Sequence, residues 1–71
     1  MSNGTPLGGR VQEARQAAGL SRAELAEKAG STEAAVRLWE NGQRHPRIKY
    51  LQRIAVATDR PLAWFFEEVA A

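Results

Sequence analysis

The chain has 71 residues, a net charge of +2 and no cysteine. This length accommodates one small domain, and the absence of cysteine excludes a disulfide scaffold, a cysteine-ligated zinc finger and a thiol nucleophile. The longest aromatic and aliphatic run, Leu62 to Phe66, is far shorter than the roughly 20 residues that span a membrane, so we expect a cytoplasmic protein without a membrane partner.

The first two predicted helices lie between residue 7 and Gly30. The apolar face of the first one has helical spacing and consists of Leu7, Val11, Ala14 and Ala18. Gly19 follows it, as glycine often does just past a helix end. Ser21 with Glu24 three residues later is the capping-box pattern. We therefore expect a second helix over 21–29 that ends at Gly30.

The third and fourth predicted helices are each marked by a few apolar positions. Ser31 or Thr32 can cap the third helix, whose core-facing residues are Val36 and Trp39. A loop over 43–46 separates it from the fourth helix. The apolar face of the fourth helix consists of Ile48, Leu51, Ile54 and Ala55.

A short fifth helix is predicted over 61–66. At α-helical spacing Leu62, Phe65 and Phe66 face the core, and Trp64 is then left exposed. An exposed tryptophan is a common interface anchor, which makes Trp64 a candidate contact between two copies of the chain. A surface aromatic residue without a partner is the alternative.

The spacing around Gly30 predicts a helix-turn-helix made by the second and third helices. Two helices that cross through a short turn need a small residue at the crossing, which Ala26 supplies, and a residue free to adopt positive φ, which Gly30 supplies. Val36 and Trp39 hold the third helix to the core by one face. Its outward face consists of Thr32, Glu33, Ala34, Arg37, Leu38 and Asn41.

These elements predict the all-α class, a compact bundle of five short helices. The predicted divisions are a flexible N-terminal lead-in at 1–6, one domain at 7–68 and a C-terminal tail at 69–71. Charge is distributed unevenly, because residues 1–36 carry four basic and four acidic side chains whereas residues 37–60 carry six basic and two acidic ones. Such a basic band suggests an anionic partner, most commonly nucleic acid, and a solvated helix face is the alternative.

Four segments together resemble the lambda-repressor-like helix-turn-helix family, the Cro/CI or XRE type of bacteria and phages: GLSRAELAEKAG, STEAAVRLWENG, RHP and LAWFF. The resemblance covers roughly residues 7–66. It implies that the helix over 32–42 enters the major groove of double-stranded DNA while the helix over 21–29 lies across the backbone. It also implies pairing on a palindromic operator, so we expect a weak homodimer reinforced on DNA, with the exposed Trp64 near the contact.

The resemblance assigns roles to individual residues. Arg15 and Glu40 match an arginine and a glutamate that form an ion pair between the first and third helices. Base readout is assigned to Thr32, Glu33, Ala34, Arg37 and Leu38. Contact with the DNA backbone is assigned to Arg22, Asn41, Arg44, Arg47 and Lys49.

Several positions depart from the family pattern. Glu33 stands where a glutamine often reads adenine, and a carboxylate, which only accepts hydrogen bonds, would fit a cytosine amino group or repel the phosphates. Ala34 replaces a polar reader and offers only contact with a thymine methyl group. Arg37 is the best donor available for a guanine edge, and Arg22 replaces a glutamine that often binds a phosphate. We therefore expect few direct hydrogen bonds to the bases.

Catalysis is not indicated. The sequence has no Ser/His/Asp arrangement, metal-ligand cluster or glycine-rich phosphate loop, and no metal or cofactor is expected. His45 is the only histidine and has no cysteine to join it. The predicted function is a sequence-specific DNA-binding transcription regulator, a small Cro-like or immunity-type repressor. The alternative is a helical protein-interaction module such as an antitoxin or phage regulatory partner.

Overall fold

The computed structural model describes residues 6–67. Its elements are the helices α1 (Pro6–Ala17), α2 (Arg22–Ala29), α3 (Glu33–Glu40) and α4 (Ile48–Ala57) and the 3-10 helix η1 (Leu62–Phe66). No strand occurs between residues 6 and 67, so the predicted all-α class is confirmed. Helix α1 begins one residue inside the predicted lead-in. The rest of the lead-in and the predicted tail at 69–71 lie outside the described residues.

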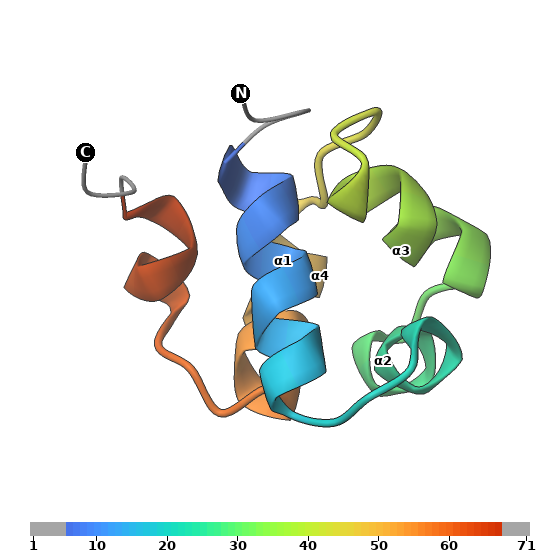
Figure 1. Cartoon of the computed structure of the whole chain (residues 1–71), viewed down its shortest axis with the longest axis horizontal. Helices are drawn as coiled ribbons and strands as arrows, with labels where there is room; N and C mark the ends of the chain where they lie inside the picture. Colours follow the sequence, from blue (N-terminus) through green and yellow to red (C-terminus); the bar gives the residue numbers. More distant parts are fainter. Residues whose placement is uncertain (1–5, 68–71) are drawn as a thin grey trace.

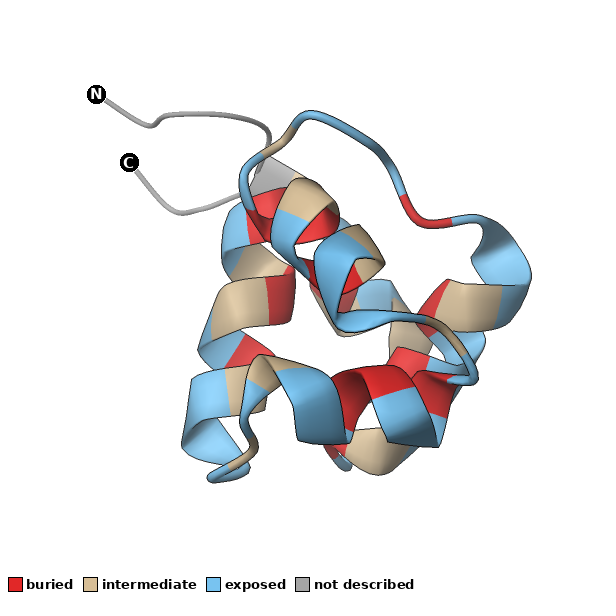
Figure 2. Ribbon diagram, turned by 90° about the vertical axis from the view of Figure 1, so that its right-hand side faces the viewer, coloured by how far each residue is buried: buried red, intermediate tan, exposed pale blue. Residues whose placement is uncertain are grey.

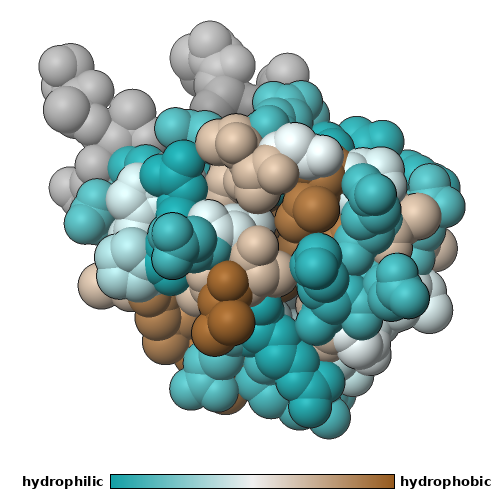
Figure 3. Space-filling view, turned by 90° about the horizontal axis from the view of Figure 1, so that it is seen from below, coloured by the Kyte–Doolittle hydropathy of each residue, from teal (hydrophilic) through white to brown (hydrophobic). Residues whose placement is uncertain are grey.

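Helix α1 lies in the middle of the molecule. Figure 1 shows α4 behind it, α2 and α3 on one side and η1 on the other. The buried residues lie on the helix faces that point toward one another (Figure 2). The core consists of Val11, Ala14, Leu25, Ala26, Ala29, Val36, Trp39, Leu51, Ile54, Ala55 and Phe65. On the face seen in Figure 3, hydrophobic residues stand apart among hydrophilic ones.

The turn between α2 and α3 forms as predicted. The Ser21 hydroxyl accepts a hydrogen bond from the backbone N–H of Glu24 at 3.0 Å, and the Glu24 carboxylate accepts one from the backbone N–H of Ser21 at 2.8 Å. Hydrogen bonding of the Glu24 carboxylate, first by the backbone N–H of Ser21 and then by the Ser21 hydroxyl, lowers the pKa of Glu24 below its ordinary value. Gly30 has φ of 72° and ends α2, and Thr32 rather than Ser31 caps α3. The capping box and the glycine turn are therefore confirmed.

Two predicted core positions that precede η1 are wrong. Ala18 is exposed because α1 ends at Ala17 and Ala18 lies in the turn that follows. Ile48, the first residue of α4, is 54% exposed. Tyr50 extends the inward face of α4 instead, because its ring packs on Trp39 with 5.7 Å between the ring centroids.

The orientation of residues in η1 also differs from the prediction. A 3-10 helix has three residues per turn, so Leu62 and Phe65 share the inward face. Phe66 falls above Ala63 on an outward face and is 58% exposed, although α-helical spacing predicted it in the core. The burial of Phe65 is confirmed.

Trp64 is half-buried and not fully exposed as predicted. Its ring meets that of Phe65 edge-on, with the centroids 5.0 Å apart. The guanidinium carbons of Arg10 and Arg60 lie 4.5 and 4.1 Å from the Trp64 ring centroid. These are cation–π distances, so two arginines cover part of the surface that the sequence left open.

A close helix approach occurs at Gly8, which is buried in α1. A Cβ atom at this position would lie 2.6 Å from the carbonyl oxygen of Trp39 and 2.9 Å from that of Glu40. Real Cβ atoms do not approach backbone atoms so closely. The backbone of α1 therefore rests directly on the C-terminal end of α3, and only glycine allows this spacing.

Candidate nucleic-acid interface

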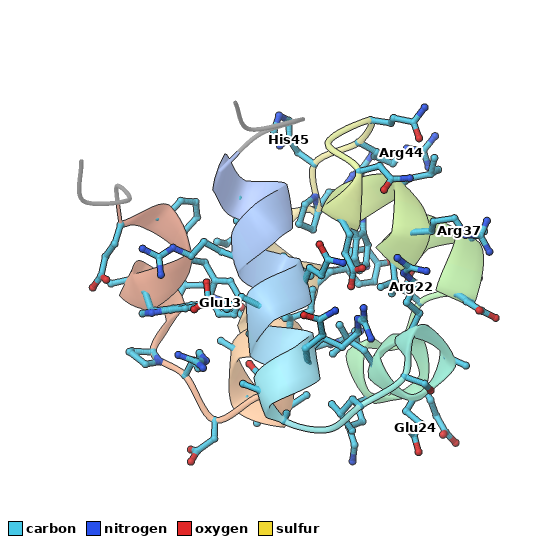
Figure 4. The ribbon with its side chains drawn as sticks, viewed as in Figure 1. Glu13, Arg22, Glu24, Arg37, Arg44 and His45 are labelled. Atoms are coloured by element: carbon cyan, nitrogen blue, oxygen red, sulfur yellow. The ribbon has the colours of Figure 1, made fainter. Side chains whose placement is uncertain are left out.

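Helix α3 is held to the core by one face and exposes the other. Val36, Trp39 and Glu40, at i, i+3 and i+4, are buried. Of the outward residues, Leu38 is half-buried, and the exposed ones are Thr32, Glu33, Ala34, Arg37 and Asn41. Figure 4 shows Arg37 projecting from α3 away from α1. The structure therefore presents all five predicted base-readout residues along the accessible side of one short helix.

The segment after α3 folds back against that helix. The backbone N–H groups of Gln43 and Arg44 both donate to the carbonyl oxygen of Leu38, at 3.0 and 3.3 Å. Pro46 is buried and anchors the segment, whereas Arg44 and Arg47 on either side of it are exposed. Two cations are thus displayed at the C-terminal end of α3.

A hollow of about 630 Å³ lies between α3 and this segment. Its polar lining residues include Thr32, Arg44, His45, Arg47 and Tyr50. Two guanidinium groups and several hydroxyl and ring donors suit an anion such as a phosphate oxygen. Within the described chain no three His, Cys, Asp or Glu side chains are arranged to hold a metal ion.

A buried carboxylate connects α3 to α1 and α2. The Glu40 side chain is 1% exposed, and Arg15 Nε of α1 donates to its Oε2 atom at 2.6 Å. Arg15 Nη2 donates to Glu40 Oε1 at 3.3 Å, and Arg15 Nη1 donates to the Leu20 carbonyl at 2.9 Å. The structure thus brings Arg15 and Glu40 together in a two-pronged contact.

Arg22 of α2 shares the same carboxylate. Its Nε atom donates to Glu40 Oε1 at 3.0 Å, while about a third of its side chain stays accessible to solvent. Sequence reasoning missed this contact. The arginine in place of a glutamine at position 22 was its only signal, because it adds a second cation near the ion pair. Two guanidiniums around one carboxylate leave a net charge of +1 that a phosphate could balance.

Arginines from α2, from α3 and from the segment after α3 lie on one side of the molecule (Figure 4). In Figure 4, Arg22, Arg37 and Arg44 all lie on the side of α2 and α3, and Glu13 lies across α1 from them. Asn41, the residue after α3, and Lys49, in the first turn of α4, are both exposed. An exposed helix bordered by cations matches the requirement of major-groove docking, in which phosphate contacts position a helix whose side chains reach base edges.

The chain matches the family model described as helix-turn-helix over residues 11–65. No curated protein matches the chain in sequence. No helix between residues 6 and 67 is long and apolar enough to cross a membrane.

Several solved structures share the fold. The restriction-modification controller protein C.AhdI from Aeromonas hydrophila is 33% identical, with a TM-score of 0.80 over 86% of this chain and 92% of that one. The N-terminal DNA-binding domain of SinR from Bacillus subtilis is 27% identical, with a TM-score of 0.82 over 92% and 96% of the two chains. SinR in complex with DNA is 27% identical, with a TM-score of 0.80 over 86% and 98%.

Proposed function

The chain belongs to the helix-turn-helix family, and we propose that it is a DNA-binding transcription regulator that reads double-stranded DNA with α3. The observation that carries the proposal is the exposed face of α3 with Arg22, Arg44 and Arg47 beside it. The controller protein C.AhdI and the DNA complex of SinR support it, because both share this fold over most of their length.

Within this function the residues take two kinds of role. Base readout falls to Thr32, Glu33, Ala34, Arg37 and Leu38, with Arg37 as the donor for a guanine edge and Glu33 as the acceptor for a cytosine amino group. Arg22, Asn41, Arg44, Arg47 and Lys49 contact the DNA backbone and set the register of α3. Glu40 holds Arg22 in place through the 3.0 Å bond to its Nε, which leaves the Nη groups for a phosphate.

The regulatory role we propose is that of a small Cro-like or immunity-type repressor, acting in the cytoplasm of a bacterial cell or a phage-infected host. The family and the structural relatives support DNA binding rather than catalysis. Selection of bound sequences from a random DNA pool at two salt concentrations tests the function. Enrichment of one motif supports it, and the absence of any enrichment would favour a protein-interaction module.

The contribution of Arg44 and Arg47 to DNA-binding affinity is expected to be independent of DNA sequence. Arg44→Ala and Arg47→Ala should each weaken binding about equally on the selected site and on a mismatched one. Each should also reduce the slope of log K against log salt concentration by about 0.9, because one phosphate contact and its released counterion are lost. Arg60→Ala, which removes a cation next to Trp64, serves as the control and should leave the slope unchanged. An unchanged slope in the first two variants contradicts the assignment.

Arg37 is expected to select one base pair. Its exposed side chain on α3 is the longest hydrogen-bond donor among the five readout residues. Arg37→Ala should cost about 1–3 kcal/mol of binding free energy on the best site and relax the preference at a single position. Competition titrations against single-base variants of the site measure this. Uniform weakening on all variants would instead make Arg37 a phosphate contact.

The proposed homodimer places two copies of α3 in successive major grooves of a palindromic operator, about 34–36 Å apart. Since Phe66 is exposed and Trp64 half-buried, we propose that both contribute to the contact. Phe66→Ser should leave the thermal midpoint of unfolding nearly unchanged and abolish cooperative occupation of the two half-sites. Val56→Ser, which changes an exposed residue of α4, is the control. Cooperative binding retained in Phe66→Ser places the interface elsewhere.

A further inference from the structure

A second basic surface, which shares only Lys49 with the proposed DNA contact, lies in a groove between α2 and α4. The groove has a volume of about 670 Å³ and is lined by Lys28, Lys49, Gln52, Arg53, Val56 and Ala57. Every charged residue among these is a cation. Apart from Lys49, none of them is assigned to DNA, so the DNA-binding function leaves most of this surface unused.

One stripe of α4 forms most of the groove. Lys49, Gln52, Arg53 and Val56 lie at i, i+3, i+4 and i+7, which places them on one helix face. The inward face of α4 is formed by other residues, among them Leu51 and Ile54. The groove face therefore plays no part in the core of this domain and is available for a partner.

Arg53 is fixed at the α2 side of the groove. Its Nη1 atom donates to the carbonyl oxygen of Ala29, in the last turn of α2, at 3.3 Å. Its guanidinium lies 6.0 Å from the ring centroid of Tyr50, and Lys49 Nζ lies 5.0 Å from the same centroid. A guanidinium held in this way loses less conformational freedom on binding than a free one. Its remaining N–H groups are therefore preorganised for an anion.

Val56 gives the groove an apolar element. It is 82% exposed, the highest value among the large hydrophobic residues between 6 and 67 that are exposed. It lies three residues from Arg53 and seven from Lys49, so one partner segment could touch all three. The groove thus combines cations with an unpartnered aliphatic side chain.

We propose that this groove binds an acidic segment of a partner protein, one that carries carboxylates for Lys28 and Arg53 and an apolar side chain for Val56. Charge complementarity identifies the partner as anionic. The exposed valine favours a protein over a DNA backbone, because burial of an aliphatic side chain stabilises contact with apolar groups, which phosphates do not provide. Lys49, at the end of the groove nearest to Arg47, remains assigned to DNA.

The test uses the full chain, labelled with ¹⁵N, and a glutamate-rich peptide with leucines at helical spacing as the probe. Backbone amide shifts should change along Lys28, Gln52, Arg53 and Val56. A peptide with glutamine in place of each glutamate should not bind. A peptide with serine in place of each leucine should bind at least about fivefold more weakly.

Variants of the protein separate the groove from the rest of the basic surface. Lys28→Gln and Val56→Ser, both at exposed positions, should each weaken peptide binding several-fold, whereas the matched change Arg37→Gln should not. Shift changes centred on Arg37 and Arg44, or no dependence on Val56, overturn the proposal.

DNA titrations of the same variants run in parallel: a lower salt slope in Lys28→Gln would assign the groove to phosphate and overturn the proposal as well. If the wild-type chain does not bind DNA, the proposed function is wrong, and the peptide result is unaffected.

Discussion

Glu40→Gln is expected to lower the free energy of unfolding by about 3–5 kcal/mol, the usual cost of removing one partner from a buried ion pair. The Glu40 side chain is 1% exposed and accepts hydrogen bonds from both Arg15 and Arg22. The variant leaves two guanidiniums around a neutral amide, which cannot balance their charge. The charge of Arg15 is the less well solvated of the two, because its side chain is only 11% exposed. A loss of this size is comparable with the whole stability of many small domains, so much of the variant should be unfolded at 37 °C.

Urea or thermal unfolding followed by circular dichroism measures this loss. The control is Glu33→Gln, which removes the same charge from an exposed position on the same helix and should change stability by less than about 0.5 kcal/mol. The double variant Arg15→Met/Glu40→Leu should recover much of the loss, because both buried charges are then absent and Arg22 can turn to solvent. A Glu40→Gln protein as stable as the wild type would show that the cluster contributes nothing to folding.

Gly8→Ala is expected to destabilise the domain by about 1–3 kcal/mol, the usual cost of overpacking, even though alanine is the better helix former. The added methyl group would meet the carbonyl oxygens of Trp39 and Glu40 at 2.6 and 2.9 Å. These are backbone atoms at the end of α3, which cannot rotate away as a side chain can. Relief of the contact requires α1 to move off α3, and this shift also stretches the pairing of Arg15 with Glu40.

Gly9→Ala is the matched control. Gly9 is the next residue of α1, and a Cβ atom there would meet nothing within 4 Å. This substitution should stabilise the domain by about 0.5–1 kcal/mol through helix propensity alone. Thermal midpoints that move in opposite directions for the two neighbours confirm the close approach. A stabilising effect of both would contradict it.

Local patterns were enough to predict the all-α class and the helix-turn-helix. Ser21 with Glu24, and Gly30, act through backbone atoms a few residues away, so the sequence contains the whole interaction. The error at Ile48 arose because the neighbour that decides the inward face lies on another helix. Ile48 fits an apolar stripe, yet contact between Tyr50 and Trp39 sets the inward face at that end of α4.

The errors in η1 have a different physical origin. Leu62, Phe65 and Phe66 share a face only at 3.6 residues per turn, and the segment adopts a 3-10 geometry instead. Periodicity in five residues does not distinguish the two geometries. The Arg10 and Arg60 contacts with Trp64 could not be predicted either, because they depend on how η1 docks beside α1.

At the candidate interface, the helical spacing located the outward residues of α3, and the resemblance located the partners Arg15 and Glu40. It did not indicate that Arg22 would join them, because the family pattern has a neutral residue there. The approach of Gly8 to α3 was also missed, since a glycine in a helix gives no sign of which backbone lies against it. Both contacts depend on the relative placement of helices, which a pattern along one chain does not encode.

The shared carboxylate of Glu40 has a consequence for how operators are distinguished. It ties α3 to α1 and α2 at once, so the recognition helix meets DNA as part of a rigid body. When a rigid surface and a flexible duplex do not match, the duplex bends or twists to fit. The cost of that deformation depends on base sequence, even at base pairs that no side chain touches. With Ala34 and Leu38 offering no hydrogen bonds, we expect stiff and pliable DNA steps beside the contacted bases to contribute a large share of the sequence preference.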